Sequence, residues 1–199
     1  MGHSTIFDVI SSIVIGGFLI LIISQLYGTV AENTFTNTSE LTVQENLVAL
    51  VRIIENDFRK IGYCADPSKI PDPSKSIITA TEHSISFKTD ENNDGVLDTL
   101  SYMTGLPSGL TSTPNPRDKL LYRSVSNQPT IPISLGVVKF DFLYYNALGD
   151  SLNFPISNPN EIYAMRLSVL LESPYAYDTT YTYAYWRQLR LAARNLKNR

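Results

Sequence analysis

The sequence has few of the residues on which most catalysis and most nucleic-acid binding depend. It contains one cysteine, Cys64, and two histidines, His3 and His83, which lie far apart in the chain. No disulfide can form within the chain, and the two histidines do not make a credible pair. The only basic cluster runs from Arg187 to Arg199, and the formal net charge is −3. The composition therefore gives no electrostatic reason to expect a nucleic-acid partner.

Short catalytic motifs are missing as well. The sequence has no Gly-x-Ser-x-Gly, no Walker loop, no Cys-x-x-Cys and no His-Glu-x-x-His. We therefore expect that the protein is not an enzyme, and an anchored hydrolase is the weakest of the functions that we consider.

The N-terminal part of the chain is a long hydrophobic run instead. From Val9 to Leu26 it is interrupted only by serine, glycine and one glutamine. About 20 apolar residues in a helix span a bilayer, so the run predicts a membrane anchor over residues 1–30. A cleaved signal peptide is the alternative, but no basic residue precedes the run and the sequence after it is a poor cleavage site.

Residues 31–62 continue the helix with a polar face and an apolar stripe. Threonine and asparagine are frequent in residues 33–39, and we expect this stretch to be softened or melted. Gly62 and then Pro67 predict the end of the helix. The apolar residues largely follow spacings of three and four and predict one stripe for a sheet to cover. They are Leu41, Val43, Leu47, Val48, Leu50, Val51, Ile54, Phe58 and Ile61.

Residues 63–199 predict a β-rich globular head, because runs of alternating polarity are separated by turn residues. We expect a strand over residues 76–90, a turn at Asn-Asp-Gly and a second strand ending near residue 105. Further strands are expected over 119–125, 136–146, 161–173 and from residue 181 through Trp186. The predicted fold class is α+β, with a long N-terminal helix packed on an antiparallel sheet.

The order of several stretches resembles type IV pilin-like proteins, and more narrowly PilW-type minor pilins and J-type minor pseudopilins of type II secretion. The resemblance covers nearly the whole chain, with loose individual motifs. It rests on "STIFD" at the N-terminus, "ENLVALVRIIENDFRKIGY" at the end of the helix, "ISFKTDENNDGVLDTLSYMTG", "GVVKFDFLYYNALGD" and the terminal "RLAARNLKNR".

The resemblance implies a subunit of a pilus-like filament or of a pseudopilus. Cleavage would occur between His3 and Ser4, and Asp8 would pair with the N-terminal amine of a neighbouring subunit. Three features depart from the family pattern: His3 replaces glycine, the leader has three residues and no basic residue, and Asp8 replaces glutamate. A peptidase that refuses histidine would leave Met1 in place. Taken alone, Asp8 is also explained as an acid near the start of a helix at headgroup level.

Residues 90–98 carry a pattern of oxygen ligands. Asp90, Asn92, Asp94 and Asp98 occupy positions one, three, five and nine of a calcium loop, and Gly95 occupies position six. The twelfth position is Ser101 rather than glutamate. The pattern therefore predicts either a weak Ca²⁺ site or a polar hairpin turn, and calcium is the one cofactor that we consider.

Together these features predict a single-pass inner-membrane protein with an extracytoplasmic head, an extracellular filament subunit, or both in turn. The expected partners are copies of itself or other pilin-like subunits, the membrane, and secretion or pilus assembly machinery. The alternative is a membrane-anchored extracytoplasmic binding module that does not polymerise and that depends on calcium in one version.

Overall fold

Helix α1 spans Gly2–Arg59 in a computed structural model, which describes residues 2–110, 112–176 and 179–191, with the backbone alone at 2–4 and 189–191. The helix continues through residues 33–39, where the sequence led us to expect softening. Threonine and asparagine cost at most about 0.7 kcal/mol each in a helix relative to alanine. This small cost does not prevent residues 33–39 from continuing the helix between the helical segments on both sides.

The molecule divides into two compact units, Met1–Ser39 and Glu40–Arg199. The first unit is helical throughout its described residues. The second unit contains the rest of α1 and the whole sheet. The predicted α+β class, with a helix packed on an antiparallel sheet, is confirmed within this second unit.

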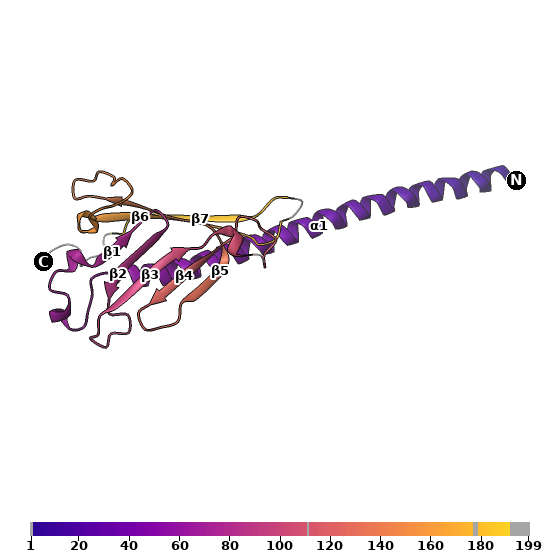
Figure 1. The fold of residues 1–199 in the computed structure, drawn as a ribbon. Helices are drawn as coiled ribbons and strands as arrows, with labels where there is room; N and C mark the ends of the chain where they lie inside the picture. The colour runs from indigo at the N-terminus through magenta and orange to yellow at the C-terminus, as the bar shows by residue number, and fades with distance from the viewer. Residues whose placement is uncertain (1, 111, 177–178, 192–199) are drawn as a thin grey trace. The chain divides into compact units, whose positions relative to one another are not determined.

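The described residues form one seven-stranded sheet in which strands neighbour one another in chain order and every pair is antiparallel (Figure 1). The strands are β1 (Ile77–Ala80), β2 (Ser84–Thr89), β3 (Asp98–Thr104), β4 (Lys119–Val125), β5 (Ile131–Tyr145), β6 (Ala164–Glu172) and β7 (Tyr183–Leu191). Short 3-10 helices precede β1 at Pro67–Lys69 and Pro73–Lys75, and two more lie between strands at Pro107–Gly109 and Pro159–Glu161.

The long strand β5 turns the sheet around α1. Its first part pairs with β4 up to Val137, and from Val137 onward it pairs with β6. The free edge of the second part meets the β1–β2 turn, because the Phe142 N–H donates to the Glu82 carbonyl at 2.8 Å. The sheet is therefore curled, and its concave face holds the core.

Phe58 of α1 lies at the centre of this core. Its ring centroid is 5.6 Å from that of Phe87, 5.6 Å from that of Tyr102 and 6.0 Å from that of Phe142. Aromatic pairs at these separations add to the stabilisation from burial. The other buried apolar residues of α1 lie on the same face and are Val43, Leu50 and Ile54.

The predicted single apolar stripe is wrong in one respect. Leu41 and Val48 are 62% and 51% exposed, whereas Val43 and Leu50 are buried. At about 100° per residue, positions 41 and 43 lie about 200° apart around the helix. The sequence therefore contains two stripes, and the sheet covers only one of them.

The helix ends as Gly62 predicted. Gly62 has φ +70° and donates its N–H to the Lys88 carbonyl at 3.0 Å. A Cβ at this position would lie 2.9 Å from Ser76 Oγ and 3.1 Å from the Pro73 carbonyl oxygen. Glycine is needed here both for the left-handed conformation and for the close approach.

Three strands differ from the sequence-based prediction. The strand expected over residues 76–90 is a hairpin of β1 and β2, and the strand expected from Gly136 begins at Ile131. The strand expected to end at Trp186 continues to Leu191. The β1–β2 turn is held by hydroxyl groups, with Thr81 Oγ1 2.7 Å from Ser84 Oγ. Pro132 is tolerated because this part of β5 pairs only with β4.

Candidate functional site

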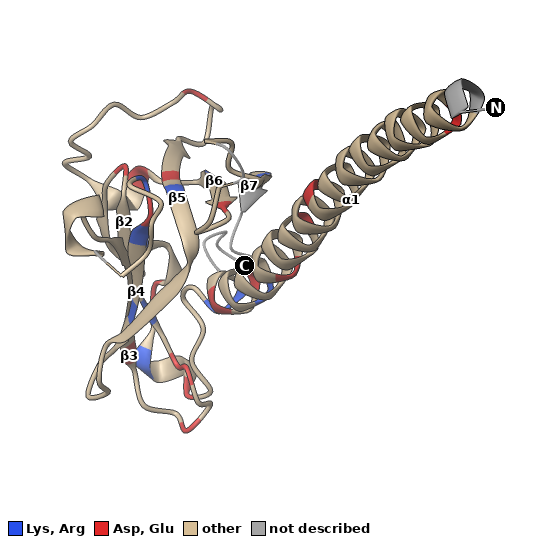
Figure 2. Ribbon diagram, turned by 90° about the vertical axis from the view of Figure 1, so that its right-hand side faces the viewer, with Lys and Arg blue, Asp and Glu red and all other residues tan. Residues whose placement is uncertain are grey.

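The described chain leaves the apolar surface of residues 5–30 uncovered. Within Thr5–Arg59 the most apolar window has a mean hydropathy of 2.6, and none of that window is buried. This is the one helix in the described residues that is long and apolar enough to cross a membrane. Figure 2 shows that the N-terminal part of α1 is almost free of charged residues. By its length and composition, α1 is therefore a candidate membrane anchor.

Asp8 lies near the start of this apolar surface. The residue is exposed, and its carbonyl oxygen accepts a hydrogen bond from Ser12 Oγ at 2.7 Å. His3 and Ser4, the predicted processing residues, belong to α1, but their side chains lie outside the described part of the structure. The pairing of Asp8 with an amine on another subunit therefore stays a prediction.

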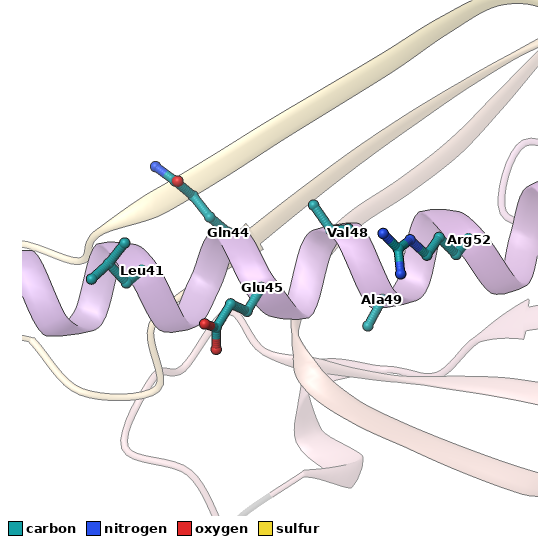
Figure 3. Close-up of a pocket in the computed structure, with 6 residues that line it drawn as sticks. All are labelled: Leu41, Gln44, Glu45, Val48, Ala49 and Arg52. Atoms are coloured by element: carbon teal, nitrogen blue, oxygen red, sulfur yellow. The ribbon is translucent and has the colours of Figure 1, made fainter.

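A second uncovered surface of α1 lies in the second unit. An open groove of about 370 Å³ is lined by side chains of α1 alone (Figure 3). They are Leu41, Gln44, Glu45, Val48, Ala49 and Arg52. Successive lining residues are three or one positions apart, so they share one helix face. We refer to this surface as the outer groove.

A buried ion pair joins the covered face of α1 to the sheet, and the sequence interpretation missed it. Arg123 Nε of β4 donates to Asp57 Oδ2 at 2.7 Å, and Tyr102 Oη of β3 donates to the same oxygen at 2.6 Å. Arg123 Nη2 also reaches Glu91 Oε1 at 3.1 Å. One signal was present, because Asp57 lies three residues after Ile54 and thus falls on the buried face.

These contacts fix the charge states of the groups. The bond to Asp57 raises the pKa of Arg123, chiefly by stabilising its charged form. Burial raises the pKa of Tyr102 well above its usual range, and the Asp57 carboxylate raises it further. Tyr102 therefore keeps its proton and acts as a donor. The cluster fastens α1 to β3 and β4.

The predicted calcium loop uses its first carboxylate in another way. Asp90 is fully buried, and its two oxygens accept backbone N–H groups of Ala65 at 3.0 Å, Gly95 at 2.9 Å and Asp94 at 3.1 Å. Burial raises the pKa of this carboxyl, but the N–H donors together lower it more, and the net pKa lies below the usual range. Asp90 thus organises the turn after β2.

The other predicted ligands are also engaged. Asp94 accepts from the side-chain amide of Asn92 at 2.8 Å and from the Val96 N–H at 2.7 Å. Asp98 accepts from Ser126 Oγ at 3.1 Å. In the described residues, no three His, Cys, Asp or Glu side chains are grouped to hold a metal ion. The local geometry is that of a hydrogen-bonded hairpin turn, and calcium binding there is untested.

No family model, curated protein or solved structure matches this chain. The class of protein that the fold defines is an α+β protein with one candidate membrane span and an antiparallel sheet packed on the end of the same helix.

Proposed function

We propose that the protein is a structural subunit, minor or major, of a type IV pilus-like filament or of a type II secretion pseudopilus. The observation that carries the proposal is the uncovered apolar surface of α1 between residues 5 and 30. Bilayer hydrocarbon before assembly and apolar helices of other subunits after assembly are the two surroundings that suit it. The sequence resemblance to pilin-like proteins points to the same role, which is structural rather than catalytic.

In this proposal the chain is first a single-pass inner-membrane protein with residues 63–199 on the extracytoplasmic side. Its partners are copies of itself or related pilin-like subunits, which meet through α1, together with the machinery that assembles them. Nucleic acid is not a partner.

Asp8 has a specific role in this assembly. A carboxylate within an apolar helix is costly, at about 2.5–3.5 kcal/mol near the bilayer centre and less toward the surface. An amine at the N-terminus of a neighbouring subunit would offset this cost, because opposite charges attract more strongly where water is excluded. Cleavage before Ser4 places that amine on Ser4, and retention of Met1 moves it about 4–5 Å along the helix.

The experiment compares Asp8→Ala with Asp8→Glu in cells that make the filament. We expect Asp8→Ala to reduce the filament-incorporated fraction at least about tenfold, which corresponds to about 1.4 kcal/mol, while Asp8→Glu retains incorporation. Mass spectrometry of the incorporated chain identifies whether it begins at Ser4 or at Met1. Normal incorporation of Asp8→Ala would remove the pairing role. A wild-type chain that stays solitary in cells would favour the non-polymerising binding module.

The outer groove provides a second contact in the same proposal. Glu45 and Arg52 line it seven residues apart, which is about 10.5 Å along a helix and too far for a pair within one chain. Two parallel helices displaced by that distance bring Glu45 of one copy opposite Arg52 of the next. The exposed Leu41 and Val48 would then be covered by the same contact.

Charge reversal tests this contact. We expect Glu45→Arg and Arg52→Glu each to lower filament incorporation, and the double variant to restore it, because the reversed pair attracts again. Glu161→Arg on an exposed loop is the matched control and should leave incorporation unchanged. A double variant that is as poor as the single variants would argue against the pairing of these two residues.

A further inference from the structure

A polar cluster lies where the loop before β4 packs on the end of β6, and none of its residues belongs to the helix surfaces described above. Asp118 precedes β4 and is 1% exposed, and Glu172 ends β6 and is 6% exposed. Asn115 holds the loop in place, because its side-chain amide donates to Glu172 Oε2 at 2.9 Å and to the Ser173 carbonyl at 3.3 Å. Arg117 Nη2 reaches the same Glu172 oxygen at 2.9 Å.

The unusual feature of this cluster is a buried carboxylate without donors. By hydrogen-bond geometry neither carboxylate oxygen of Asp118 has a partner among the described residues, and the buried Thr113 Oγ1 has none either, although the Thr113 hydroxyl lies near enough to lower the pKa of Asp118. Burying an unpaired carboxylate is costly, and buried polar atoms nearly always find a partner. Asp90 illustrates the ordinary solution, with three N–H donors on its oxygens. Asp118 is therefore compensated less well than Asp90 among the described residues.

We propose that Asp118, Glu172 and Thr113 bind a hard divalent cation, Ca²⁺, between the loop before β4 and the end of β6. The available ligands are carboxylate and hydroxyl oxygens, which are the atoms that Ca²⁺ prefers. Two carboxylates supply the negative charge, so the site needs no third acidic or histidine ligand. Ca²⁺ accepts irregular sets of oxygen ligands and completes them with backbone carbonyls and water.

Arg117 forms the outer wall of this site. Its side chain is 55% exposed, and its guanidinium lies 5.2 Å from the ring centroid of Tyr181. The same guanidinium thus contacts Glu172 and the Tyr181 ring at once, and the exposed side chain is free to swing toward solvent when a cation takes its place. Arg117 thus neutralises Glu172 in the cation-free protein.

The surroundings of Asp118 on balance disfavour its charged form. Burial raises the pKa of Asp118; Thr113 lowers it, the Glu172 carboxylate raises it and Arg117 lowers it, and the net pKa is above the usual range. A cation beside Asp118 would supply the positive charge that these surroundings lack. The groups that face Asp118 in the described structure are Thr113, Arg117 and Glu172.

The test uses the full chain in detergent micelles, stripped of metals with chelator, and adds Ca²⁺ alone or Mg²⁺ alone. We expect calorimetry to show one Ca²⁺ site, and a saturating excess of Ca²⁺ to raise Tm by roughly 5–10 °C. We expect a weaker response to Mg²⁺, which demands stricter geometry. Absence of Ca²⁺ binding in the wild-type chain overturns the proposal without any variant.

Three variants locate the site. Asp118→Asn should abolish the calorimetric signal and the Tm shift, and Thr113→Val, which keeps the side-chain shape, should weaken binding at least fivefold. Asp94→Asn, in the loop that the sequence predicted to be either a weak Ca²⁺ site or a polar turn, is the matched control and should keep the full response. Loss of binding in Asp94→Asn with retention in Asp118→Asn would place the cation in that loop and overturn the proposal.

A protonated Asp118 is the competing explanation for its lack of donors. In that case Asp118→Asn would match or exceed the wild-type Tm without cations, and Ca²⁺ would leave both Tm values unchanged. This outcome also overturns the proposal. The measurements use purified protein, so their result does not depend on whether the chain forms filaments.

Discussion

The two halves of α1 are both rich in valine, isoleucine, leucine and phenylalanine, but only the second half has a face that its own chain covers. Phe18 is 63% exposed and Phe58 is 1% exposed. In residues 40–59, polar residues alternate with apolar ones, so a single sheet covers the buried stripe. In residues 5–30, apolar residues occupy every face of the helix, which no single sheet covers. The distribution of side chains around the helix, more than composition, decides which half requires a partner from outside.

The largest test of this comparison is a matched pair of phenylalanine substitutions. Phe58→Ala should lower the free energy of unfolding of the head by about 3–5 kcal/mol, because it leaves a cavity at the centre of the core. Phe18→Ala should change it by less than about 0.5 kcal/mol. Urea unfolding in detergent micelles, followed by the fluorescence of Trp186, measures both. Trp186 is the one tryptophan of the chain and packs against the core.

A similar effect of the two substitutions on the Trp186 transition would contradict the separation of α1 into a covered half and an uncovered half. A transition that is unchanged by Phe58→Ala would remove Phe58 from the core.

The next largest effect should come from the two aspartates of α1. Asp57→Ala leaves Arg123 and Tyr102 without their shared acceptor, and should cost about 3 kcal/mol of unfolding free energy. Asp8→Ala should leave the unfolding of the head unchanged. The same fluorescence assay applies, and the double variant Asp57→Ala, Arg123→Ala should cost less than the sum of the single variants. Additive costs would show that the two side chains are not coupled.

The smallest effect should come from two glycines. Gly62→Ala should cost about 1–2 kcal/mol, because alanine disfavours a positive φ and its Cβ would press on Ser76 and Pro73. Gly17→Ala meets no atom within 4 Å and should leave the head unchanged. Thermal unfolding of the two variants side by side makes the comparison, and equal Tm values would show that the left-handed turn is not required.

Periodicity and turn residues account for most of the correct sequence-based predictions. The helix and its end at Gly62 follow from spacing and from glycine. The β1–β2 turn was not predicted, because Thr81 and Ser84 form it without glycine or proline and the alternation of polarity continues across it. The early start of β5 was not predicted, because a proline such as Pro132 usually marks a turn or the edge of a sheet.

The polar sites show a sharper limit of prediction. Asp90, Asn92 and Asp94 have oxygen atoms at calcium-loop spacing, but the same spacing suits acceptance of backbone N–H groups, and sequence does not separate the two uses. The Asp57–Arg123 pair joins residues far apart in the chain, and the loop that carries Asp118 is joined to the end of β6 by the Asn115–Glu172 hydrogen bond. Such pairings depend on tertiary contacts that local patterns do not encode.

The attachment of the sheet to the last turns of α1 also determines how the protein would bear mechanical force. The ring contacts of Phe58 and the Asp57–Arg123 pair lie to the side of the helix axis. A pull along α1 would therefore load all of these contacts at the same time, and in shear. Contacts loaded together share the force, whereas paired strands pulled apart from one end break in succession. Sliding of the helix along the sheet would therefore require these contacts to break together.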